Sequence, residues 1–342
     1  MKDMICFEDF LPQGEEAASL QSRIAEGKLV HALMITGEPG TGKRTLAALT
    51  ASALMCRAQT GIPCGECAGC RMAASGEHPD ITVIEKGVPL SPETAKGRST
   101  IPVDDIREMI RICSQYPFEG GNRAVIIRDA ENMTPQAQNC LLKILEEPPQ
   151  NTYFILTTSH PDQMLTTVRS RCRQVKLSPW DESFIETVLI RSGTEKEKAK
   201  KAASVSAGSI GNAIRLVSDD GYWQLREEVM NAFFRNRKRS EILAVSTSWK
   251  DRKADADTVF SILEDDMRRL MRYRIVPDSK PDIGEFPAEW QRFAAEADPE
   301  RFANLNDRIR EARKQNAFNV NFQAIIERLL LTFTGESDLW LN

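Results

Sequence analysis

Short apolar runs alternate with stretches of helical spacing through the first half of the chain. The runs expected to be buried strands lie at residues 33–36, 81–85, 124–127 and 153–157. The stretches expected to be helices between them lie at residues 45–55, 103–113 and 135–145. Because strands that alternate with helices form parallel sheets covered by helices, the pattern predicts an α/β fold for this half.

Strand signals fade after Arg173, and the rest of the chain has the apolar spacing of helices. Three helices, which together would form a small lid, are expected at residues 179–189, 195–206 and 211–217. A proline-rich patch at residues 277–287 is expected to be a loop. We therefore predict an α/β domain, a three-helix lid and an all-α C-terminal domain, at residues 1–165, 166–217 and 218–342.

Length and composition agree with a multidomain globular protein. A chain of 342 residues with 41% hydrophobic content predicts two or three domains. The net charge of −4 argues against a protein that grips DNA by its own surface, since such proteins are usually basic. The first residues carry acids and a proline where a signal peptide needs an apolar run, and no stretch reaches membrane-spanning length. We expect a cytoplasmic protein with no membrane partner.

Four of the eight cysteines lie within one short stretch, and they are Cys56, Cys64, Cys67 and Cys70. Each Cys-x-x-Cys step brings two thiolates within reach of one ion, and four sulfurs complete a tetrahedral shell. The spacing predicts a structural Zn²⁺ module, because a full shell leaves no position for a reacting water. A disulfide cluster is the alternative, and it is disfavoured in a cytosolic chain.

The sequence GEPGTGK, at residues 37–43, fits the phosphate-loop pattern between the first strand and the next helix. Backbone N–H groups and a helix N-terminus would face phosphate there. The residues that would hold a nucleotide are Gly37, Gly40, Gly42 and Lys43, with Asp129 on a later strand. However, Arg44 replaces the hydroxyl residue that holds Mg²⁺, and Thr45 lies about 100° further round the helix. ATP binding and a loop kept only as a structural turn both stay open.

The second metal-binding element also departs from the pattern of an ATPase. Its strand ends at Asp129, but Ala130 stands where a carboxylate should polarise the attacking water. Glu131 is adjacent and is expected to project in another direction. Because phosphoryl transfer depends on positioning and charge stabilisation, the two losses predict little or no ATP hydrolysis by this chain itself.

Several motifs occur in an order that resembles the bacterial clamp-loader subunits of DNA polymerase III, which are AAA+ proteins. They are the phosphate loop, the four-cysteine module, GEHPD at 76–80, NCLLKILEEPP at 139–149 and RSRC at 169–172. The resemblance covers at least residues 20–215, and the helical remainder is compatible with the collar domain of that family. It implies an AAA+ domain with an inserted zinc module, a lid and a collar.

Two kinds of subunit share these motifs, namely the gamma/tau ATPase motors and the delta-prime family, which has lost catalysis. This chain resembles the delta-prime family at three nucleotide-facing positions. Arg44 and Ala130 are two of them, and Gly211 stands where the motors carry an arginine. The intact Lys43 leaves nucleotide binding open. The alternative is an ATPase motor with an unorthodox loop, in which Thr45 or Glu131 would have to replace the missing groups. A stand-alone zinc-containing DNA-binding module is a third, weaker reading, because basic, aromatic-rich runs are missing from the sequence.

The resemblance implies a role for Arg171 in trans. In the family, the arginine of the SRC motif projects into the ATP site of a neighbouring motor subunit. The implied partners are delta and gamma/tau in a hetero-oligomeric ring, which places the sliding clamp on primer-template DNA. Cys172 is expected to be a packed thiol, Thr157 and Thr158 match a phosphate-sensing position, and Glu146 and Glu147 are expected to end a helix.

Overall fold

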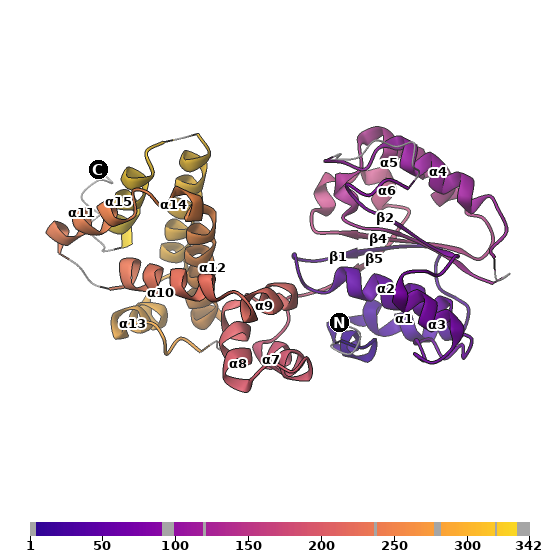
Figure 1. The fold of residues 1–342 in the computed structure, drawn as a ribbon, viewed down its shortest axis with the longest axis horizontal. Helices are drawn as coiled ribbons and strands as arrows, with labels where there is room; N and C mark the ends of the chain where they lie inside the picture. Colours follow the sequence, from indigo (N-terminus) through magenta and orange to yellow (C-terminus); the bar gives the residue numbers. More distant parts are fainter. Residues whose placement is uncertain are drawn as a thin grey trace. The chain divides into compact units, whose positions relative to one another are not determined.

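The structure is a computed structural model that describes residues 5–90, 99–118, 121–235, 238–276, 282–318 and 320–333. The chain divides into two compact units (Figure 1). The sheet unit comprises Met1–Trp180 together with Ser209–Gly211. The helical unit comprises Asp181–Gly208 and Asn212–Asn342.

A parallel sheet of five strands forms the centre of the sheet unit, in the order β2-β3-β4-β1-β5. The strands are β1 (Ala32–Thr36), β2 (Ile81–Ile84), β3 (Arg123–Ile127), β4 (Thr152–Thr158) and β5 (Arg173–Lys176). Every residue of β1 and β3 is buried, which is why these strands are near-continuous apolar runs. The order places β1 between β4 and β5, and the loop that follows β1 therefore lies at the carboxyl edge of the central strands.

Helices cover both faces of this sheet. Figure 1 shows α4, α5 and α6 on one face and α1, α2 and α3 on the other. The helical segments are η1 (Glu8–Gln13), α1 (Glu15–Ala25), α2 (Lys43–Leu54), α3 (Ala68–Ser75), α4 (Val103–Cys113), η2 (Ala130–Asn132), α5 (Pro135–Glu146), η3 (Pro161–Gln163) and α6 (Thr166–Arg169). Ile106, Met109, Leu141 and Phe154 are fully buried between the sheet and α4 and α5. The predicted α/β fold class is confirmed.

The sequence reading missed the edge strand and the first helices. β5 pairs with β1 and has the sequence RQVK, in which only Val175 is buried. An edge strand with one buried residue gives no apolar run, so periodicity does not reveal it. The segments η1 and α1 precede β1, and Phe10 and Leu20 from them are buried against the rest of the unit.

The remaining segments are helical, as the apolar spacing predicts, and all but the first two residues of α9 belong to the helical unit. They are α7 (Glu182–Arg191), α8 (Lys196–Val205), α9 (Ile210–Val217), α10 (Asp220–Phe233), α11 (Arg239–Ser248), η4 (Lys253–Asp255), α12 (Ala256–Ile275), α13 (Ala288–Glu296), α14 (Pro299–Ala317) and α15 (Phe322–Phe333). The expected loop at 277–287 lies partly outside the described residues, and 282–287 contain neither helix nor strand. None of the helices in the described ranges is long and apolar enough to span a bilayer.

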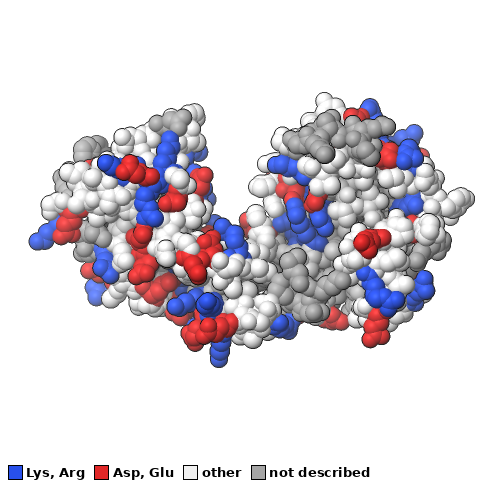
Figure 2. Space-filling view, in the orientation of Figure 1, with Lys and Arg blue, Asp and Glu red and all other residues white. Residues whose placement is uncertain are grey.

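Aromatic side chains fill the core of the helical unit. Phe234 contacts Phe286, Trp290 and Phe333 in edge-to-face pairs, and its ring centroid lies 4.9 Å from that of Trp290. Positively and negatively charged side chains are interspersed over the surface of this unit in Figure 2. On the visible side of the helical unit, basic side chains are mixed with acidic ones and do not form a broad basic face. The net charge of the chain is acidic as well.

A buried ion pair joins α10 to α12 within this core. Arg226 and Asp266 are 4% and 2% exposed, and their two hydrogen bonds measure 2.7 and 3.1 Å. Glu285 also accepts from Arg226 at 2.8 Å and contacts Arg269. Buried charges are tolerated only when paired in this way, because desolvation of a lone charge costs several kcal/mol.

We predict that Asp266→Ala lowers the free energy of unfolding of the chain by about 3–5 kcal/mol, because it leaves the buried guanidinium of Arg226 without its bidentate partner. Urea unfolding followed by circular dichroism measures the change. The control is Asp307→Ala, which removes an exposed pair with Arg310 and should change stability by less than about 0.5 kcal/mol. Equal effects of the two substitutions would contradict the role assigned to the buried pair.

Candidate functional site

The phosphate loop connects β1 to α2 in a conformation that requires glycine. Gly40 and Gly42 have φ of 77° and 92°, in the left-handed region. A Cβ on Gly37 would lie 2.6 Å from the carbonyl oxygen of Leu177, just beyond β5. The loop is therefore packed closely against the end of the edge strand.

Lys43 folds back onto this loop. Its ammonium donates to the carbonyls of Gly37 and Glu38 at 2.9 and 2.8 Å, and the residue is 5% exposed. Burial lowers the pKa of Lys43, although the carboxylates of Asp129, Glu131 and Glu38 oppose that shift. The lysine that should meet phosphate is thus held by carbonyls of its own loop.

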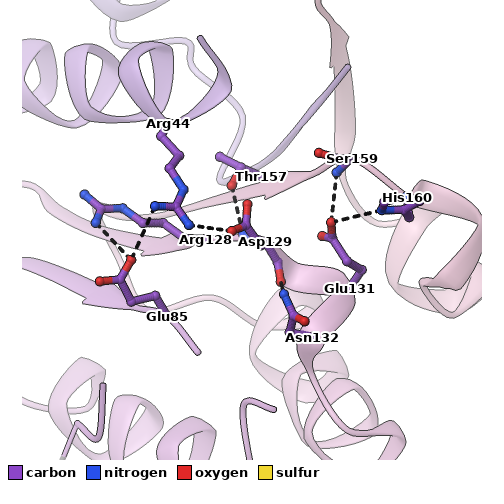
Figure 3. Close-up of polar contacts among 9 residues, drawn as sticks. All are labelled: Arg44, Glu85, Arg128, Asp129, Glu131, Asn132, Thr157, Ser159 and His160. Atoms are coloured by element: carbon purple, nitrogen blue, oxygen red, sulfur yellow. Dashed lines mark hydrogen bonds and ion pairs between the residues drawn. The ribbon is translucent and has the colours of Figure 1, made fainter. Parts of the chain in front are cut away.

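Arg44 forms an ion pair with the acid at the end of the third strand (Figure 3). Its Nη2 lies 2.5 Å from Oδ2 of Asp129, and its Nη1 lies 3.9 Å from Oε2 of Glu85. The hydrogen bond to Asp129 raises the pKa of Arg44. Arg128 contacts the same carboxylate of Glu85 at 3.1 Å. A guanidinium therefore pairs with Asp129, the acid that the sequence analysis gives as a candidate for the nucleotide site.

The magnitudes indicate how Arg44 acts. A half-exposed pair such as Arg44–Asp129 contributes about 0–1 kcal/mol, so its own strength is a weak barrier to a metal ion. The guanidinium would also repel a divalent ion that approached the same carboxylate. This repulsion and the missing hydroxyl ligand, and not the strength of the pair, are the expected barriers to a metal ion.

Glu131 points away from this ion pair (Figure 3). Its Oε1 accepts from the backbone N–H of Ser159 at 3.1 Å and lies 3.5 Å from Nδ1 of His160. Thr157 Oγ1 accepts from the N–H of Asp129 at 3.1 Å, and Thr158 Oγ1 accepts from the N–H of His160. These threonines stabilise the turns that follow β3 and β4, and Glu131 lies in the other direction, as the sequence analysis expected.

Ser209 and Gly211 approach the phosphate loop within the sheet unit. The N–H of Gly211 donates to the carbonyl of Gly40 at 3.1 Å. A Cβ on Gly40 would lie 2.1 Å from Oγ of Ser209, and a Cβ on Gly211 would lie 3.1 Å from Cα of Gly40. Main-chain atoms of Gly211 therefore pack directly on Gly40, which leaves little room for a side chain at position 211.

Two aromatic residues that the sequence analysis did not single out support the same loop. Phe10 of η1 is fully buried, and a Cβ on Gly42 would lie 3.1 Å from its ring. Trp180 donates its Nε1–H to the carbonyl of Thr41 at 2.9 Å and packs edge-to-face on Phe10. The sequence around the loop does not reveal this contact, because the two aromatic residues lie far from the loop along the chain.

The four clustered cysteines come together between α2 and α3. The sulfurs of Cys56, Cys64, Cys67 and Cys70 all lie within 4.8 Å of one another. Two sulfurs on one tetrahedral metal ion with 2.3 Å bonds would lie about 3.8 Å apart, and those of Cys64 and Cys70 lie 3.9 Å apart. The arrangement fits a metal ion with four sulfur ligands.

Backbone N–H groups point at these sulfurs and favour the thiolate form. The amides of Cys64, Cys67 and Cys70 each lie 3.4 Å from the sulfur of the preceding cysteine of the cluster. Burial opposes ionisation of Cys67, but N–H groups of Arg57 and Cys70 bring its pKa down to about 6. Burial raises the pKa of Cys70 to about 12. A thiolate is the metal-binding form of cysteine, so part of the cluster is prepared for a cation.

Arg171 lies just beyond α6, and its side chain is 34% exposed. Its Nε donates to Oε1 of Glu146 at 2.8 Å, and its Nη1 donates to the carbonyl of Thr167 at 2.8 Å. The next residue, Cys172, is 8% exposed, and burial raises the pKa of its thiol to about 12. The thiol therefore packs as an inert apolar group.

A family model described as "DNA polymerase III, delta subunit" matches residues 13–181. A DNA polymerase III subunit delta' of Escherichia coli is 39% identical over 208 residues, which are 60% of this chain and 60% of that protein. The same subunit of Bacillus subtilis is 26% identical over 317 residues, which are 91% of this chain and 93% of that protein.

Gamma-type proteins are similar as well. A DNA polymerase III subunit gamma of Buchnera aphidicola is 30% identical over 220 residues, which are 62% of this chain and 57% of that protein. Among solved structures, a Thermotoga maritima protein described as related to the gamma subunit aligns with 92% of this chain and 97% of its own. Its sequence identity to this chain is 18% and the TM-score is 0.45.

We predict that the purified chain carries about one metal ion, and that Cys64→Ser reduces the metal content to less than half, because three sulfurs leave the shell incomplete. Elemental analysis after gel filtration measures the metal. Cys6→Ser is the control, since this exposed thiol lies outside the cluster and its loss should leave the content unchanged. Full metal content in Cys64→Ser would show that the cluster is not the binding site.

Proposed function

We infer that the chain belongs to the delta-prime family of DNA polymerase III subunits, and we propose that it serves the clamp loader as a subunit that does not hydrolyse ATP. The observation that carries this proposal is the pairing of Arg44 with Asp129, next to Ala130. A cation fixed on the metal-binding acid, with no carboxylate at the following position, removes both the Mg²⁺ site and the group that polarises water.

We further propose that Zn²⁺ is the ion held by the four cysteines. Zinc is the usual metal of a closed four-thiolate shell, and such sites are structural. The cluster would tie the end of α2 to α3, since its ligands come from just after α2 and from the start of α3. Bound zinc would supply no reactive position, and the phosphate loop would be unaffected by its chemistry.

In the proposed assembly, Arg171 acts on the triphosphate of a neighbouring gamma/tau subunit. Its half-exposed guanidinium lies outside the phosphate loop of its own chain and is positioned by α5 and α6. A guanidinium is always charged and presents a planar fork of donors to phosphate oxygens. The ring would also contain delta, and it would open the sliding clamp and place it on primer-template DNA.

A gamma/tau-like motor is the second candidate function. The intact Lys43 and the 30% identity to a gamma subunit favour it. In that case Lys43 must leave the carbonyls of Gly37 and Glu38, and Arg44 must leave Asp129, before Mg²⁺ and nucleotide enter. The motor therefore requires two rearrangements that the non-hydrolysing subunit does not.

We predict that Mg²⁺ changes the affinity of the purified chain for ATP by less than about twofold, because the charge of Arg44 opposes a divalent ion at Asp129. Fluorescence titration with a labelled ATP, in EDTA and in Mg²⁺, measures this. In Arg44→Thr, which restores a hydroxyl at that position, Mg²⁺ should tighten binding by at least fivefold if the loop accepts nucleotide. Tenfold tighter binding of ATP by the unaltered chain in Mg²⁺ would favour the motor instead.

We predict that Arg171→Ala lowers DNA-stimulated ATP turnover of the reconstituted ring by at least tenfold, which is a modest share of the roughly 10³–10⁵ that an arginine finger can supply. Gel filtration should show that the ring still assembles as it does with the unaltered chain. The matched control is Arg173→Ala, which removes a nearby arginine that pairs with Glu16. Unaltered turnover in Arg171→Ala would remove the role in trans.

A further inference from the structure

The guanidinium of Arg171 is held from one side by its own chain. Its Nε and Nη2 both donate to Oε1 of Glu146, and its Nη1 donates to the carbonyl of Thr167. Glu146 is the last residue of α5, and Thr167 lies in α6. Two neighbouring helices therefore fix the orientation of one partly exposed side chain.

The number of donors shows what is left for a ligand. A guanidinium has five N–H groups, and three of them are engaged by Glu146 and Thr167. One N–H on Nη1 and one on Nη2 have no acceptor among the described residues. Two such donors, one on each nitrogen, are what bidentate binding of a phosphate requires.

The backbone around this pair is itself anchored. The N–H of Leu165 donates to Oε1 of Gln138 in α5 at 2.8 Å, and Gln138 is 3% exposed. Val168 and Cys172, on either side of Arg171, are buried in the core between the helices and the sheet. Glu146 and Arg171 thus extend from segments that are packed together, and both side chains are partly open to solvent.

We propose that Glu146 is a positioning residue for Arg171, which presents the two unengaged N–H groups of the guanidinium to a phosphate on a neighbouring subunit. This inference rests on the proposed role of Arg171 in trans. A long arginine side chain has many rotamers, and restricting it to one of them costs conformational entropy. If Glu146 holds Arg171 in one orientation before the ring assembles, that cost is not met during turnover. Glu146 remains bonded to the Nε side while the outer edge of the fork meets the phosphate.

The test is ATP turnover of the reconstituted ring with Glu146→Ala, Arg171→Ala and the double variant in the full chain. Glu146→Ala should lower kcat about fivefold and leave KM for ATP within about twofold, because loss of orientation affects the chemical step more than substrate binding. In the Arg171→Ala background, Glu146→Ala should cause no further fall, since its effect passes through that side chain.

Glu147→Ala is the matched control, because this exposed neighbour has no recorded side-chain ion pair in the described part of the chain, and its turnover should match that of the unaltered ring. Turnover at or above the unaltered rate in Glu146→Ala would overturn the proposal, as would an equal loss in the presence and absence of Arg171. If Arg171→Ala itself leaves turnover unchanged, the role in trans fails first, and that result is distinguishable from a failure of Glu146 alone.

Discussion

The ion pair between Arg44 and Asp129 is the constraint on which the account of this site depends. It joins the first turn of α2 to the end of β3 across the position where a P-loop enzyme holds its metal. Its own stabilisation is small, because both side chains are partly exposed. Its expected consequence for a divalent ion is repulsion, because a positive charge is fixed beside the acid that would bind that ion.

The rest of the loop is consistent with a site that is filled by its own chain. Lys43 donates to carbonyls of the loop, and Gly211 contacts Gly40. Trp180 donates a hydrogen bond to the loop and packs on Phe10. These contacts give the glycines of the loop a role in packing that does not depend on ATP hydrolysis. A phosphate loop can be retained for the packing of its turn, and in the proposed assembly the partly exposed Arg171 would serve a triphosphate bound to another subunit.

Much of this architecture follows from the sequence, because its main signals are local. Buried strands such as β1 and β3 are continuous apolar runs, and the cysteines of the metal cluster lie within one short stretch. Arg44 and Ala130 depart from a motif whose positions have fixed roles, so the prediction that Mg²⁺ is not held there rests on those residues alone.

The missed features have long-range causes. β5 is an edge strand with one buried residue, so it lacks an apolar pattern. Phe10 and Trp180 contact each other beside the loop, although they lie in distant parts of the chain. Glu146 contacts Arg171 only because α5 packs on α6. Such pairs depend on how helices pack, which spacing along the chain does not determine.

The central claim is that this chain does not cleave ATP, and the most direct measurement is release of phosphate by the isolated protein in saturating ATP and Mg²⁺. We expect no turnover above that of a Lys43→Ala variant. Steady turnover that disappears in Lys43→Ala would contradict the account.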